Sequence, residues 1–195
     1  MKVYEYKNYE EYLENQIEAN VKKLKNIYVE KRTIRKICED KKQATKILCH
    51  GTRNAAEQFY FKESFPDAEI IGTEVSHTAS KFPMTVQHDF NNVREDWVGY
   101  FDVVYSNAFD HCFDPIRTIK VWSDQMSSTG KLYLEHGYGP DDNNARPWDP
   151  VEIYDDELRQ LFKSTGLQLE STFESTGLKG KVPCRVYVLT KWKHL

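Results

Sequence analysis

The segment 46–61, KILCHGTRNAAEQFYF, constrains the fold of this chain more than any other stretch. A short apolar run leads into a turn at Gly51 and then into apolar residues at helical spacing, which predicts a strand, a tight turn and a helix. This unit builds the nucleotide-binding α/β folds. Gly51 allows a ligand to approach the backbone, and the N–H groups that open the helix favour an anionic or polar ligand. An ordinary strand–turn–helix connection gives the same pattern, so the rest of the chain decides between the two interpretations.

Strand and helix patterns alternate over the rest of the chain. Apolar and alternating runs predict seven strands, over residues 46–50, 68–74, 85–90, 101–107, 131–136, 167–174 and 185–192. Helical spacing is clearest over 54–65 and from Pro115 to about Met126, and Gly130 is expected to turn the chain into the fifth strand. The last two strands lack a helical connection and should pair as a hairpin. The pattern predicts an α/β fold: a Rossmann-like three-layer sandwich with a mostly parallel seven-stranded sheet and a C-terminal antiparallel hairpin.

The first 45 residues carry a helical pattern of their own. Apolar residues recur at steps of three and four from Tyr9 to Tyr28, and Ile34 and Ile37 continue this helix or begin a second one. We expect an N-terminal helical extension over 1–45 and a single globular domain over 46–195, because no repeat or Gly/Pro-rich linker divides the chain. The extension should cover the ligand cleft or its rim and help to select the substrate.

Composition argues against several classes of protein. No apolar run approaches the roughly 20 residues of a membrane helix, and the acidic, tyrosine-rich start lacks the apolar core of a signal peptide, so we expect a cytoplasmic protein without a membrane partner. The net charge of −3 gives no overall attraction to nucleic acid, although basic residues cluster between Lys22 and Lys42. The four cysteines form no CxxC pair, which argues against a zinc site and for reduced thiols. The oligomeric state stays open.

Ligand-binding residues of a parallel α/β sheet lie just after its strands. Glu74 ends the second strand, where a carboxylate can accept hydrogen bonds from both hydroxyls of a ribose. Asp89 and Phe90 end the third strand and suit an adenine, which stacks on an apolar face and donates from its amino group. The fourth strand ends at Asn107, and a loop containing His111 follows. Each residue alone fits an ordinary loop position, but the loops converge on one cleft, and a binding site explains the set better.

From Lys46 to Trp192 the chain resembles the class I S-adenosylmethionine-dependent methyltransferases. The matching motifs are ILCHGTRNAAE, GTEVS, HDF, FDVVYSNAFDHCFDP and SSTGKLYLEHG, and the antiparallel end of the sheet matches as well. The resemblance implies S-adenosylmethionine as the cofactor, with its methionine end held by Gly51 and its neighbours. The cofactor-binding residues that it implies are Gly51, Thr52, Arg53, Glu74, Val75, Asp89, Phe90 and Asn107.

The first loop departs from the pattern of this family at two points. The family commonly has an acidic residue two positions before the first glycine, in contact with the amino end of the cofactor, where this chain has Cys49. The later glycines of the loop are replaced by Arg53 and Ala55. A guanidinium grips a carboxylate through two hydrogen bonds, so Arg53 is a candidate partner for the cofactor's carboxylate.

Methyl transfer from a sulfonium requires the nucleophile and the methyl group in line, and sometimes a base. His111 and His136 are the candidate bases, with His111 preferred, and Tyr138 is a candidate orienting or acid–base group. The loop SNAFDH lacks the Asn/Asp-Pro-Pro-aromatic run of enzymes that methylate DNA bases, which favours a small-molecule or saccharide-type acceptor, methylated on oxygen or nitrogen. The pair Asp141–Asp142 lies among turn-forming residues, so no metal is expected there.

Three other functions fit parts of the sequence. The replaced loop glycines also suit a methyltransferase-like module that binds without catalysis, and the basic cluster suits an RNA-directed methyltransferase. An NAD-dependent enzyme of related fold is disfavoured by the C-terminal hairpin and by Asp89. Titration with S-adenosylmethionine, S-adenosylhomocysteine and NAD separates the binding module and the NAD-dependent enzyme from the main interpretation. Salt-dependent RNA binding tests the RNA-directed methyltransferase.

Overall fold

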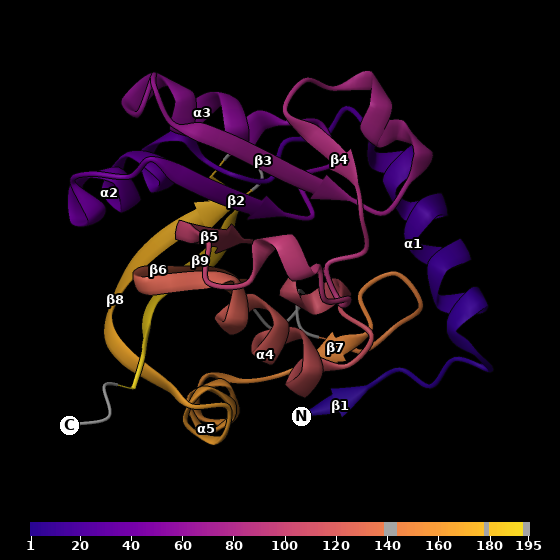
Figure 1. The fold of residues 1–195 in the computed structure, drawn as a ribbon. Helices are drawn as coiled ribbons and strands as arrows, with labels where there is room; N and C mark the ends of the chain where they lie inside the picture. The colour runs from indigo at the N-terminus through magenta and orange to yellow at the C-terminus, as the bar shows by residue number, and fades with distance from the viewer. Residues whose placement is uncertain (139–143, 178–179, 193–195) are drawn as a thin grey trace.

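Seven strands form one mixed sheet in the computed structural model, which describes residues 1–138, 144–177 and 180–192 (Figure 1). These strands are β2 (Lys46–His50), β3 (Glu69–Glu74), β4 (Thr85–Gln87), β5 (Phe101–Ser106), β6 (Met126–Gly137), β8 (Leu167–Gly177) and β9 (Val182–Lys191). Their order across the sheet is β4-β3-β2-β5-β6-β9-β8. Neighbours from β4 to β6 pair in parallel, and β9 pairs antiparallel with both β6 and β8. The expected sheet and its C-terminal hairpin are confirmed.

Helices cover both faces of the sheet. The α-helices are α1 (Tyr9–Lys23), α2 (Lys31–Lys41), α3 (Ala56–Ser64), α4 (Pro115–Gln125) and α5 (Asp155–Ser164). Helices α2 and α3 lie on one face, and α4 and α5 lie on the other (Figure 1). Because successive side chains of a strand point to opposite faces, Ile47 joins the core under α2 and α3, whereas its neighbour Leu48 joins the core under α4 and α5. The three-layer sandwich follows from this alternation.

Helix α1 lies outside both layers, at the end of the sheet toward which β2 and β3 run (Figure 1). It begins after Asn8, whose side chain caps the helix by accepting a hydrogen bond from the N–H of Glu11. Before α1, the short strand β1 (Lys2–Val3) pairs antiparallel with β7 (Val151–Glu152) and forms a second, two-stranded sheet. The N-terminus is therefore joined to the segment just before α5.

The structure corrects two expected strand boundaries. Strand β6 begins at Met126, which pairs with Phe101 of β5, rather than at Lys131, but the register shifts before Lys131 pairs with Val103, so the irregularity expected at Gly130 lies within the strand. A side chain at Gly130 would lie 2.6 Å from the Phe101 carbonyl oxygen, so the close pairing of these strands explains the glycine. Strand β4 ends at Gln87 rather than at Phe90, because the chain turns there and the N–H of Asn92 donates to the Asp89 carbonyl.

Some expectations are not tested by these elements. The division of the chain at residue 45 stays a prediction, although Ile34 and Ile37 of α2 lie in the same core as Phe61 of α3. The pair Asp141–Asp142 lies outside the described residues. No helix in the described ranges combines the length and the apolar character that crossing a membrane requires.

Candidate active site

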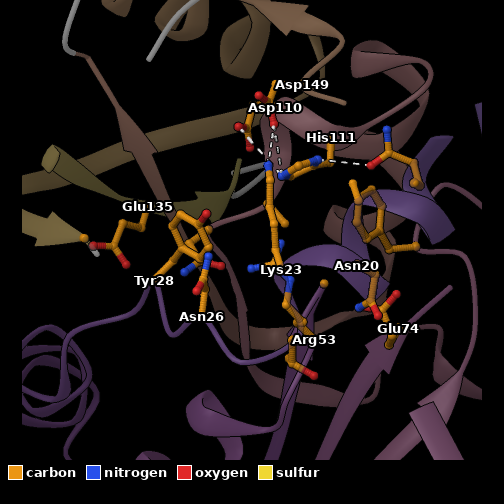
Figure 2. A pocket seen from close by; sticks show the side chains of 18 of the residues that line it. Asn20, Lys23, Asn26, Tyr28, Arg53, Glu74, Asp110, His111, Glu135 and Asp149 are labelled. Atoms are coloured by element: carbon orange, nitrogen blue, oxygen red, sulfur yellow. Dashed lines mark hydrogen bonds and ion pairs between the residues drawn. The ribbon is translucent and has the colours of Figure 1, made fainter. Parts of the chain in front are cut away.

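A cavity of about 310 Å³ opens at the carboxyl ends of the parallel strands (Figure 2). It is lined by the loops that follow β2, β3, β4 and β5, by the end of β6 and by one side of α1. Its volume lies at the lower end of the range of small-molecule sites. Figure 2 shows Arg53 and Glu74 at one side of the cavity, and Asp110, His111 and Asp149 at the opposite side.

The loop between β2 and α3 brings the backbone close to β5. Gly51 has a φ of +71°, and a Cβ atom there would lie 2.5 Å from the Cβ of Ala108, so only glycine fits. Arg53 and Ala55 have φ values of +43° and +65°. The loop therefore keeps a left-handed backbone at the two positions where the resemblance predicts glycine. Such a backbone costs a residue with a side chain about 1 kcal/mol or more. Thr52 also lines the cavity.

Glu74 lies at the cavity, as its position at the end of β3 predicts. Only 6% of the residue is exposed, and its Oε1 accepts a 2.9 Å hydrogen bond from the N–H of Ser76. Burial raises the pKa of Glu74, and nearby Arg53 opposes that rise. The side chain of Asn20, from α1, lies beside the carboxylate (Figure 2). Val75 is a further lining residue.

Asp89 lines the cavity but already has partners within the chain. Its Oδ2 accepts a hydrogen bond from the hydroxyl of Tyr9, on α1. Its Oδ1 accepts from the backbone N–H of Asn91 at 2.9 Å and from the Asn91 side chain at 2.6 Å. An adenine amino group would have to share or replace one of these donors. Phe90 and Asn107 also line the cavity, and the Phe90 ring packs edge-on against Trp122 at 5.4 Å.

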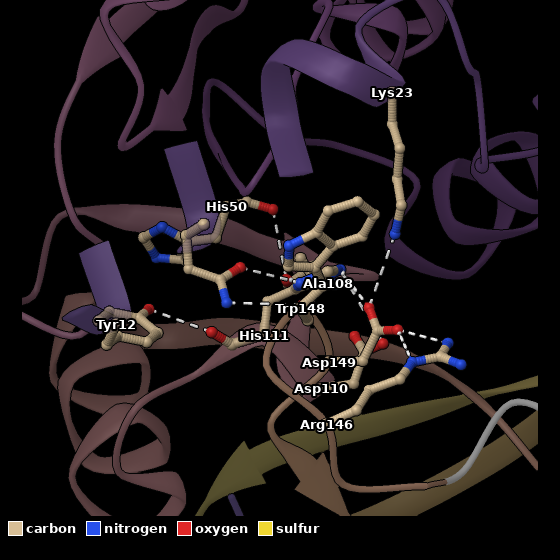
Figure 3. A network of polar contacts seen from close by, with 11 residues as sticks. Tyr12, Lys23, His50, Ala108, Asp110, His111, Arg146, Trp148 and Asp149 are labelled. Atoms are coloured by element: carbon tan, nitrogen blue, oxygen red, sulfur yellow. Dashed lines mark hydrogen bonds and ion pairs between the residues drawn. The ribbon is translucent and has the colours of Figure 1, made fainter. Parts of the chain in front are cut away.

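His111 lies in a network of charged groups at the other side of the cavity (Figure 3). Its Nδ1 is 3.0 Å from Oε1 of Gln16, which can only accept, so Nδ1 carries the proton. Its Nε2 is 3.6 Å from Oδ1 of Asp149. Asp149 also forms ion pairs with Arg146 and, at 3.8 Å, with Lys23. Burial alone would raise the pKa of Asp149, but the attraction of His111, Lys23 and Arg146, in that order, outweighs burial and lowers the pKa.

The same network contains a group of possible metal ligands. One ligand atom each from Asp110, His111 and Asp149 lies within 4.8 Å of the others. However, Lys23 and Arg146 already neutralise Asp149, and two fixed cations beside a site repel a metal ion. The charge balance of this cluster fits a polar network better than a metal site.

The structure separates the two other catalytic candidates. His136 lines the cavity but is 7% exposed, its Nε2 lies 3.3 Å from the Ile153 carbonyl oxygen, and burial lowers its pKa. Tyr138 does not line the cavity: it is 46% exposed, and its hydroxyl donates to Glu174 at 2.6 Å. The Tyr138 side chain therefore lies outside the cavity that His136 lines, which speaks against its role as an orienting or acid–base group. The backbone of Tyr138 continues the pairing of β6 with β9, through a hydrogen bond to Pro183, and this directs the side chain to β8.

Two buried carboxyl groups at the cavity are absent from the sequence-based set. Glu135 of β6 is 2% exposed, and its oxygens accept from Tyr105 at 2.5 Å and from Ser175 at 2.7 Å. Glu57, in the first turn of α3, is 5% exposed. Burial raises the pKa of Glu135 to about 7 and that of Glu57 to about 8. For Glu135 a signal existed, since it directly precedes His136 in the predicted strand 131–136.

Solved structures share this fold at low sequence identity. The 1,6-didemethyltoxoflavin-N1-methyltransferase of Burkholderia thailandensis, solved with S-adenosylhomocysteine, has a TM-score of 0.68 and 12% identity over 84% of this chain and 78% of that chain. A TehB-like S-adenosylmethionine-dependent methyltransferase of Corynebacterium glutamicum has a TM-score of 0.62 and 19% identity over 82% and 86%. A Rhodobacter sphaeroides protein named as a candidate zinc-dependent alcohol dehydrogenase has a TM-score of 0.69 and 12% identity over 96% and 100%.

No family model and no curated protein matches the sequence. The structural likenesses, together with the strand order and the antiparallel last strand, show that this chain has the fold of the class I S-adenosylmethionine-dependent methyltransferases. At sequence identities of 12% to 19%, these similarities establish the fold alone.

Proposed function

We propose that this protein is a methyltransferase that uses S-adenosylmethionine to methylate an oxygen or nitrogen of a small-molecule or saccharide-type substrate. The observation that carries the proposal is the convergence of Gly51, Glu74, Phe90 and Asn107 on one cavity at the carboxyl ends of four successive parallel strands. An ordinary strand–turn–helix connection does not require such a set at the remaining strand ends.

The chemistry of the lining suits the parts of the cofactor. Glu74 can accept hydrogen bonds from ribose hydroxyls, and Phe90 offers an apolar face to an adenine. Arg53 has a buried Nε atom with no hydrogen-bond partner among the described residues, which suits a carboxylate. When bound, the cofactor supplies an electrophilic methyl group on a sulfonium. The protein's part is to hold the acceptor in line with it and to exclude water.

We assign the role of general base to His111 rather than to His136. Gln16 accepts from Nδ1–H of His111, so Nε2 is the nitrogen that takes the proton of the acceptor, and Asp149, 3.6 Å from Nε2, stabilises the imidazolium that forms. His136 is less suitable, since burial holds its pKa below the usual range and its ring contacts a backbone carbonyl. The position of α1 along the cavity supports the proposal that this helix takes part in selecting the substrate.

Calorimetric titration tests the cofactor. S-adenosylmethionine and S-adenosylhomocysteine should bind with micromolar or tighter affinity, whereas NAD should bind far more weakly. Tighter binding of NAD would overturn the proposal in favour of a dehydrogenase.

A second candidate function is a methyltransferase-like binding module, and the side chains at the left-handed positions of the first loop favour it. The two functions differ in one result. A binding module takes up S-adenosylhomocysteine but transfers no methyl group to any acceptor in a screen with labelled S-adenosylmethionine, whereas the enzyme labels at least one.

A further inference from the structure

Arg53 of the first loop and Glu57 of α3 line the cavity, and each has an unsatisfied polar atom. Nε of Arg53 and Oε2 of Glu57 are both buried and have no hydrogen-bond partner among the described residues. Glu57 is 5% exposed, so water cannot readily replace a missing partner. A buried donor and a buried acceptor without partners each cost the full loss of their hydration. A ligand that carries both an acceptor and a donor would satisfy the two at once.

The backbone and the neighbours of Arg53 hold its side chain at this side of the cavity. Its φ of +43° is a strained conformation for a residue with a side chain, and such strain is concentrated at functional sites. The guanidinium lies over the ring of Tyr28, with 4.9 Å between its Cζ atom and the ring centroid. A guanidinium stacked on a ring keeps its N–H groups available for a carboxylate.

Glu57 lies in a surrounding that favours its neutral form. Apart from Arg53, the charged and titratable groups that act on it are negative or neutral: Cys49 of β2, Glu74 of β3, Tyr105 of β5 and Glu135 of β6. Burial, and with it the carboxylates of Glu135 and Glu74, raises the pKa of Glu57, and a hydrogen bond from its own backbone N–H together with Arg53 only partly offsets this rise. An added cation next to the carboxyl group would reverse this balance.

We propose that Arg53 and Glu57 together bind an α-amino acid group, with Arg53 on its carboxylate and Glu57 on its ammonium. The inference rests on the proposed function, which supplies such a group as the methionine part of the cofactor. The inference also explains how the chain can do without an acidic residue at position 49. The buried thiol of Cys49 cannot bind an ammonium ion. Burial raises the pKa of this thiol, and Glu57 of α3 lies close enough to Cys49 to raise it further.

Binding through Glu57 has a measurable consequence for protons. In the free cavity the carboxyl group is mostly protonated at pH 7, since its pKa is about 8. When the ligand's ammonium group arrives, Glu57 gives its proton to the solvent and pairs as a carboxylate. Binding of S-adenosylhomocysteine should therefore release up to about one proton from the protein. Binding of 5′-methylthioadenosine, which lacks the amino acid group, should release none.

Calorimetry with these two nucleosides tests the inference. Each is titrated at pH 7 in phosphate and in Tris, whose ionisation enthalpies differ, so that proton release is read from the difference. Glu57→Gln and Arg53→Gln should each weaken the binding of S-adenosylhomocysteine on the order of tenfold or more. The affinity for 5′-methylthioadenosine should stay within about twofold of the wild-type value. Glu57→Gln should also abolish proton release. Glu63→Gln is the matched control, because Glu63 is an exposed residue of the same helix.

The outcomes separate the inference from the proposed function. If the wild-type protein binds S-adenosylhomocysteine without proton release and Glu57→Gln binds it equally well, the inference is overturned and the proposed function stands. Equal weakening of both nucleosides in a folded variant also overturns it, since the site would then not be specific for the amino acid group. If a free amino acid competes with an acceptor and not with S-adenosylhomocysteine, the group belongs to the substrate, and the assignment to the cofactor is overturned. Absence of binding of either nucleoside to the wild-type protein overturns the proposed function itself.

Discussion

A carboxyl group buried as completely as that of Glu57 makes the stability of the protein depend on pH. In the unfolded chain the group ionises above about pH 4.5, but in the folded protein its pKa is about 8. The folded state therefore binds more protons between these two pH values, and its stability falls as the pH rises through this window. Above pH 8 the loss is complete and no longer changes.

Glu57→Gln should remove this loss. The free energy of unfolding of the variant, relative to wild type, should rise between pH 5 and pH 8.5, by on the order of 4 kcal/mol for a buried group with this shift. Urea unfolding at several pH values measures it, with Glu63→Gln as the control. A difference that is constant over pH would mean that Glu57 is ionised throughout. Higher stability combined with weaker S-adenosylhomocysteine binding would mark a residue kept for function at a cost in stability.

Glu74 has two separable roles, because one of its oxygens already bonds the Ser76 N–H. Glu74→Gln keeps an oxygen for that bond but loses the charge, so S-adenosylhomocysteine should bind about tenfold more weakly at nearly unchanged melting temperature. Glu74→Ala loses both contacts and should also lower the stability of the free protein. Glu69→Gln, at the exposed start of the same strand, is the control. Unchanged affinity in Glu74→Gln would leave Glu74 a residue of the turn alone.

His111 should matter for turnover and little for cofactor affinity. His111→Ala removes the proposed base, and methyl transfer to an identified acceptor should fall on the order of 100-fold or more. His77→Ala, which changes an exposed histidine, is the control. Full turnover in His111→Ala would show that positioning alone suffices for the transfer.

At the scale of the elements, α1 both lines the cavity and occupies a donor position within it. The hydroxyl of Tyr9 holds Asp89, the residue that the sequence assigns to the adenine. Tyr9→Phe removes this competing donor and should strengthen the binding of S-adenosylhomocysteine and 5′-methylthioadenosine several-fold. The adenine then no longer has to displace the Tyr9 hydroxyl from Asp89. Tyr6→Phe is the matched control, since Tyr6 lies in the same aromatic group but bonds the Pro147 carbonyl. Weaker binding in Tyr9→Phe would show that Tyr9 itself contacts the nucleoside.

The sequence predicts most elements because strands and helices differ in period. The strand and helix types, the hairpin and the strand-end position of Glu74 follow from that difference. Other features depend on contacts between residues far apart in the sequence, which the spacing of apolar residues does not encode. The two-residue ladder between β1 and β7 is too short for a pattern, and the contact of Tyr9 with Asp89 joins residues 80 positions apart. Glu57 could not be singled out from the sequence, because acidic residues are common in the first turn of any helix, where they interact favourably with the helix dipole.

In the molecule as a whole, the sheet supplies one wall of the site and α1 supplies another. The strand-end residues that face the proposed cofactor lie on parallel strands with cores on both sides. The opposite wall comes from α1 and from the segment that carries Arg146 and Asp149.

The pairing of β1 with β7 bears on the order in which the molecule folds. Lys2 and Glu152 are partners in this ladder, so it closes one of the longest loops that the chain can form. Contacts of such sequence separation form slowly, after local structure has already been gained. We therefore expect the sheet and its flanking helices to assemble first and the cavity to be completed late, when the N-terminus docks. Ligand binding would then report arrival at the native state more strictly than helix content does.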